Sequence, residues 1–101
     1  MNAIAEKLHL LEMVAPNDAL LASMLDKVLG AVADQYRQKL SGYRNKLKEL
    51  ECHHGMSTDA FLQRFEAGDL GDADKWFDWE AIAALKAEAE RKLGELERAG
   101  V

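Results

Sequence analysis

An unbroken apolar stripe in the first half of the chain constrains the fold more than any other feature. Apolar residues recur there in steps of three and four, the spacing that places side chains on one face of an α-helix. No proline interrupts residues 18–54. The pattern therefore predicts one long helix, about 55 Å at 1.5 Å per residue. The stripe consists of Leu25, Leu29, Val32, Tyr36, Leu40, Tyr43, Leu47 and Leu50.

Breaking and capping residues divide the chain into four predicted helices. Pro16 ends the first, since its ring disfavours the helical conformation at the preceding residue. Gly55 suits the left-handed residue that ends a helix, Ser57 suits the cap of a short helix, and Asp72 or Asp74 suits the cap of the last. The predicted units are an amphipathic N-terminal helix in residues 1–16 and a hairpin domain in residues 17–101. Within that domain, helices are predicted over about 18–54, 58–67 and 73–99.

Composition indicates an all-α fold. The chain has 15 Leu and 16 Ala but only seven Val, Ile and Thr, and β-branched residues lose χ1 freedom in a helix. Two long helices joined by a short one can fold back into an antiparallel, coiled-coil-like hairpin with facing stripes. Such a hairpin hides only a narrow seam, so we expect oligomerisation to complete the core. The predicted oligomer interface is Leu25, Leu29, Val32, Tyr36, Leu40, Tyr43 and Leu47.

Net charge and cysteine content narrow the possible partners and the compartment. The net charge of −5 disfavours binding to bulk nucleic acid or anionic lipid and favours a basic partner. The single Cys52 cannot form an internal disulfide, and no signal peptide or membrane segment is visible, so we expect a cytoplasmic protein. Arg37, Arg44 and Lys48 could form a nucleic-acid stripe. A solvated helix face explains them more simply.

Residues with catalytic or metal-binding chemistry are sparse. The one such cluster is Glu51-Cys52-His53-His54. Adjacent helix positions point about 100° apart, and no second Cys or His pair completes a tetrahedral zinc site. A glycine-rich phosphate loop is also missing from the sequence. We therefore expect a protein without catalytic activity, cofactor or metal ion.

Acidic and aromatic residues concentrate between residues 59 and 80. Seven acidic and two basic residues leave this window with a charge of −5, equal to that of the whole chain, and it holds five of the seven aromatic residues. Aromatic side chains supply buried anchors in protein interfaces, and charge of one sign steers an oppositely charged partner. For Phe61, Phe65 and Trp79, packing inside the hairpin is the competing interpretation. The predicted partner-binding residues are Phe61, Phe65, Leu70, Asp72, Asp74, Trp76, Phe77, Asp78 and Trp79.

Motifs in this window resemble those of a group of small helical prokaryotic proteins. The similarity covers about residues 25–96, and the group carries Tyr where this chain has His54. The motifs are Gly55-Met56-Ser57, Arg64-Phe65-Glu66, Gly68, Leu70-Gly71-Asp72 and Trp76-Phe77-Asp78-Trp79-Glu80, after a helix with Tyr36 and Tyr43. The group is associated with genes beside small toxins, so the resemblance implies an antitoxin that binds and masks a basic toxin. The alternatives are a homo-oligomeric helical scaffold or adaptor and, ranked last, DNA binding for autoregulation.

Overall fold

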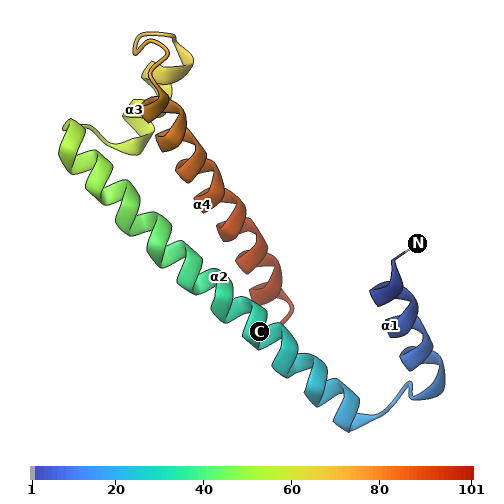
Figure 1. The fold of residues 1–101 in the computed structure, drawn as a ribbon. Coiled ribbons are helices and arrows are strands. Elements are labelled where there is room, and N and C mark those ends of the chain that lie inside the picture. Colours follow the sequence, from blue (N-terminus) through green and yellow to red (C-terminus); the bar gives the residue numbers. More distant parts are fainter. Residues whose placement is uncertain (1) are drawn as a thin grey trace.

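Residues 2–101 contain four helices, and two of them form a long antiparallel hairpin (Figure 1). The computed structural model describes residues 2–101. Its helices are α1 (Ala3–Val14), α2 (Ala19–His54), α3 (Thr58–Glu66) and α4 (Asp74–Arg98). α2 and α4 lie side by side, and α3 closes one end of the hairpin. The predicted all-α hairpin is therefore confirmed, with no strand in residues 2–101.

The helix boundaries lie close to the predicted ones, but one capping assignment is wrong. Gly55 ends α2 with a φ of 66°, a conformation that favours glycine. Ala73, which has no capping side chain, is the N-cap of α4, so neither Asp72 nor Asp74 caps it. Asp74 instead lies in the first turn of α4. Its carboxylate can still interact there with the positive end of the helix dipole.

The core is a narrow seam between α2 and α4 that widens into an aromatic cluster at the closed end. Ala33 and Ala89 are buried in the seam. At the closed end, Leu47 packs with Phe61 and Trp79, the two largest fully buried side chains.

Much of the stripe predicted as an oligomer interface is used inside the chain. Leu40 and Leu47 are only 2% and 6% exposed, because α4 of the same chain covers them. These two side chains are therefore not available to a second copy, which corrects their predicted role. Leu25 is 39% exposed. The half-buried members are Leu29, Val32, Tyr36 and Tyr43.

At its N-terminal end α2 extends past the end of α4 (Figure 1). Lys92 lies over the Tyr36 ring, with its Nζ 5.7 Å from the ring centroid, so Arg98 reaches the level of about Gly30. We call residues 3–29, which comprise α1 and the part of α2 before that level, the N-terminal arm. Leu21 and Leu29 are half-buried there. The other large apolar side chains of the arm remain at least 39% exposed: Ile4, Leu8, Leu10, Leu11, Met13, Val14, Leu20, Met24, Leu25 and Val28. No helix within residues 2–101 is long and apolar enough to cross a membrane.

Candidate partner-binding site at the closed end of the hairpin

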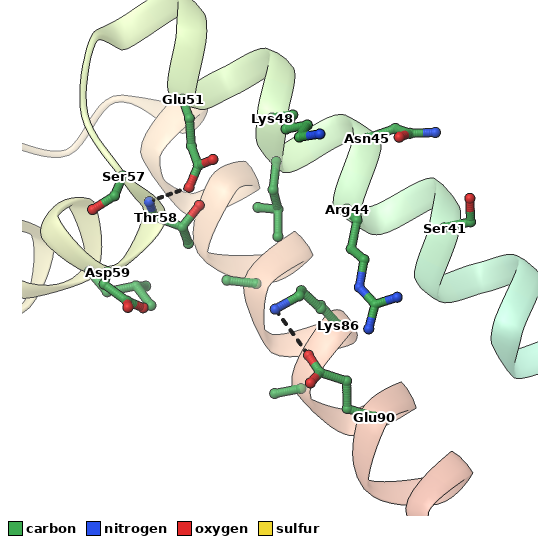
Figure 2. Close-up of a pocket in the computed structure, with 14 residues that line it drawn as sticks. Ser41, Arg44, Asn45, Lys48, Glu51, Ser57, Thr58, Asp59, Lys86 and Glu90 are labelled. Carbon is green, nitrogen blue, oxygen red and sulfur yellow. Dashed lines mark hydrogen bonds and ion pairs between the residues drawn. The ribbon is translucent and has the colours of Figure 1, made fainter.

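Hydrogen bonds hold the short helix α3 in place between α2 and α4. Ser57 Oγ accepts a bond from the backbone N–H of Ala60 at 3.1 Å and so caps α3. Glu51, in the last turn of α2, accepts a bond from the backbone N–H of Thr58 at 2.7 Å (Figure 2). The indole Nε1 of Trp79 on α4 donates to Thr58 Oγ1 at 3.2 Å. Thr58 therefore ties the start of α3 to both long helices.

A continuous series of aromatic contacts leads from the core to the surface. The rings of Trp79 and Phe61 are parallel, with centroids 4.1 Å apart and an interplanar angle of 2°. Phe61 stacks on Phe65 at 5.5 Å, and Phe65 meets Phe77 edge to face at 5.2 Å. Phe77 is 51% exposed. The half-buried Phe65 thus packs against the exposed ring of Phe77 and helps to fix its position.

Burial divides the predicted partner-binding residues into two classes. Phe61 and Trp79 are 0% exposed and belong to the core, so their predicted place on a binding surface is wrong. Their helix faces point inward once α3 folds over α4, which is the competing interpretation of the sequence. The exposed members are Phe77, Asp72, Asp74 and Asp78, and the half-buried members are Phe65, Leu70 and Trp76.

Uncompensated negative charge surrounds this end of the molecule. Every acidic side chain in residues 59–80 is exposed. None of them forms an ion pair within the described part of the chain, where all the ion pairs lie along α2 and the later turns of α4. These carboxylates are Asp59, Glu66, Asp69, Asp72, Asp74, Asp78 and Glu80. The closed end therefore presents a negative field that nearby cations do not cancel.

An apolar hollow between α3 and α4 lies beside the aromatic series. It has a volume of about 330 Å³, and its apolar surface comes from both helices. Glu66 and Glu80, two of the unpaired carboxylates, line it as well. A hollow with apolar walls and carboxylates suits a lysine or arginine, whose aliphatic stem prefers apolar contact while its charged end prefers a carboxylate. Its apolar lining residues are Leu62, Phe65, Ala83, Ala84 and Ala87.

Analysis of the sequence alone missed Glu66 and Glu80 as site residues. They are 14 positions apart on different helices, and only the fold of α3 onto α4 brings them to one hollow. The signal that could have found them is their place in the acidic window 59–80, of which Asp72, Asp74 and Asp78 are the only acidic residues among the predicted partner-binding residues.

His54 contributes a titratable ring to the aromatic cluster. Its imidazole lies 5.2 Å from the Trp79 ring and 5.0 Å from the Trp76 ring, centroid to centroid. Burial against these groups removes water from the imidazole and lowers its pKa below the ordinary value, and the positive charges of His53 and Lys75 act in the same direction. A ring at this position fits the packing of the cluster.

Mild acid is expected to destabilise the protein through His54. Below about pH 6.5 the unfolded chain, whose His54 has its ordinary pKa, binds the proton more readily than the folded chain. The free energy of unfolding should therefore fall as the pH drops from 6.5 toward the lowered pKa, and this effect should vanish above 6.5. His54→Phe, which keeps a ring without the titrating group, should reduce the loss of Tm between pH 7.5 and 5.5. An equal loss of Tm in His54→Phe and in the control His9→Gln would contradict this assignment.

A larger groove of about 730 Å³ lies between α2 and α4, beside the start of α3 (Figure 2). Arg44 and Lys48 of the predicted basic stripe line it, whereas Arg37 lies outside it and pairs with Asp34 at 2.9 Å. The charged lining residues are three cations and three carboxylates: Arg44, Lys48, Lys86, Glu51, Asp59 and Glu90. This balance favours neither a phosphate group nor a cation, so the groove does not support nucleic-acid binding.

The cluster Glu51-Cys52-His53-His54 forms no metal centre in the structure. Within residues 2–101, no three His, Cys, Asp or Glu side chains come close enough to hold an ion. Instead Glu51 accepts a hydrogen bond from the α3 backbone, and His54 packs against Trp79.

The chain matches no protein-family model, no curated protein and no solved structure. The geometry of the closed end therefore carries the functional argument.

Proposed function

We propose that this chain is an antitoxin, a non-catalytic protein that binds a small basic toxin with the closed end of its hairpin and masks it. The observation that carries the proposal is the apolar hollow lined by Glu66 and Glu80 and flanked by the supported, exposed ring of Phe77. The hollow accepts a long cationic side chain, and the ring offers an apolar anchor beside it. Together these features match the anchors and charged rim of a protein interface.

The charge distribution supports a basic partner. Glu66 and Glu80 line the hollow, and the other carboxylates of residues 59–80 are also exposed, so a protein rich in lysine and arginine is attracted before contact and oriented as it docks. A toxin that cleaves RNA has to attract phosphate groups and therefore presents cations at its active site. Carboxylates of the closed end can pair with those cations and exclude the nucleic acid. Masking of the toxin would follow from this competition.

Co-expression with the product of the adjacent gene tests the proposal. An antitoxin is expected to relieve the growth inhibition caused by that product and to co-purify with it. The Tm of the antitoxin should also rise markedly when the product is added. A homo-oligomeric scaffold without a toxin partner would unfold cooperatively on its own and show none of the three effects. Absence of both a complex and any relief of toxicity would reject the antitoxin function.

Neutralising the two carboxylates of the hollow is expected to weaken partner binding by about 30-fold or more. In Glu66→Gln/Glu80→Gln the shape of the hollow is kept, but a bound cation loses both of its charge partners, a change of about 2 kcal/mol. Titration calorimetry of the complex measures the loss, which should shrink at high salt because the lost attraction is electrostatic.

The matched control for that variant is Glu97→Gln. Glu97 is exposed near the far end of α4 and forms no ion pair in residues 2–101. Glu97→Gln should leave the affinity for the partner unchanged. Both variants should have the same Tm as the wild-type chain when no partner is bound. Equal affinities of the double variant and the control would show that the hollow does not bind the partner.

A further inference from the structure

The N-terminal arm exposes more apolar surface than is usual for a soluble monomer. Ten of its twelve large apolar side chains are between 39% and 69% exposed, and they come from α1 and from the part of α2 that α4 does not reach. Summed over the two helices, they expose on the order of 1,000 Å² of apolar surface, which meets the ~800 Å² per partner of a standard stable interface. The arm is therefore large enough to hold a second chain.

We propose that the arm pairs with the arm of a second copy, in antiparallel orientation, to form a four-helix bundle at the centre of a homodimer. Each copy supplies two helical pieces of nearly equal length. α1 has 12 residues and spans about 18 Å, and the uncovered residues 19–29 of α2 span about 16 Å. With α1 folded back along residues 19–29 of its own chain, two such pairs of helices can bury their apolar faces against each other.

Charge favours a second copy over a basic protein as the occupant of the arm. The arm carries four acidic and two basic residues, a net charge of only −2, so it offers little attraction to a strongly basic partner. The closed end, with −5 in residues 59–80, attracts such a partner much more strongly. The charged residues of the arm are Glu6, Lys7, Glu12, Asp18, Asp26 and Lys27.

Charge also selects the antiparallel orientation. Parallel pairing would place the two closed ends on the same side, with their unpaired carboxylates repelling one another. Antiparallel pairing sends them to opposite ends of the dimer. The two uncovered segments, residues 19–29 of each copy, then overlap fully when their centres coincide, which places Met24 of one copy beside Met24 of the other.

Light scattering of the full chain across a range of concentrations tests the pairing. Wild type should show twice the chain mass of 11.3 kDa. In Met24→Glu/Val28→Glu, two exposed apolar residues (55% and 60%) become acidic, which should weaken the dimer at least ~100-fold while leaving hairpin helicity intact. Leu85→Glu, at an equally exposed site on α4 (50%), should leave the dimer unchanged.

Disulfide cross-linking tests the orientation. In a Cys52→Ser background, Met24→Cys should form an intermolecular disulfide under mild oxidation, whereas Leu85→Cys should not. The proposal is overturned by a wild-type monomer at about 100 μM, by a dimer that survives the double substitution, or by failure of Met24→Cys to cross-link. The proposal would also be overturned if the apolar side chains of the arm became buried only when a different protein is added. The first three outcomes do not bear on the closed end, so the two proposals fail separately. If a different protein covers the arm, the affinity of the Glu66→Gln/Glu80→Gln variant tells whether the closed end also binds it.

Discussion

Trp79→Ala is expected to reduce the free energy of unfolding by about 4 kcal/mol, a large share of the ~5–15 kcal/mol available to a domain of this kind. Trp79 is fully buried, stacks on Phe61 and His54, and bonds Thr58 through its indole. Truncation would remove all of these contacts and leave a cavity at the junction of α2, α3 and α4. Urea denaturation followed by far-UV circular dichroism measures the change.

Trp79→Phe separates packing from hydrogen bonding at this position. It keeps a ring against Phe61 and loses the indole N–H that Thr58 accepts, so a smaller loss, about 1–2 kcal/mol, is expected. Phe77→Ala, on the exposed side of the same aromatic series, should change stability by less than either. A Trp79→Ala variant as stable as Phe77→Ala would show that the aromatic cluster does not hold the hairpin closed.

Leu40→Ala is the substitution with the second largest expected effect, about 3 kcal/mol. Leu40 is 2% exposed between α2 and α4, and truncation of a buried leucine loses both burial and packing. The matched control is Leu85→Ala on α4, where the side chain is 50% exposed and the change should be within ~0.5 kcal/mol.

The concentration dependence of this loss tells whether Leu40 packs within one chain or between chains. In the Met24→Glu/Val28→Glu background arm pairing is expected to be absent. The loss of unfolding free energy caused by Leu40→Ala should then be the same at low and high protein concentration. A loss that depends on protein concentration would show that Leu40 lies in an interface between copies, as the stripe alone suggested.

The hairpin could be predicted from the sequence because its elements are long and strongly periodic. The predicted helix 18–54 is α2 (Ala19–His54) to within one residue, since Gly55 ends it through local backbone geometry. The N-cap of α4 was predicted wrongly, because Asp72 and Asp74 are both residue types that favour this position, yet Ala73 between them occupies it. Local preference does not decide such cases.

Sequence alone could not tell which part of the long stripe is covered. Leu25 and Leu40 share the same periodicity, yet one is exposed and the other is buried. The difference arises from the lengths of the two helices and from how they are aligned, which periodicity does not encode. The hollow could not be predicted from the sequence either, because Glu66 and Glu80 line it together only after the turn between α3 and α4 has brought the two helices side by side.

The length of α2 sets the distance between the two closed ends in the proposed dimer. About 30 residues of continuous helix separate Met24 from the closed end, or roughly 45 Å at 1.5 Å per residue. Two copies joined at their arms would hold their closed ends on the order of 90 Å apart. A single small partner could not bridge that distance, so binding would be one partner per chain without avidity. An oligomeric partner, by contrast, would be cross-linked into chains.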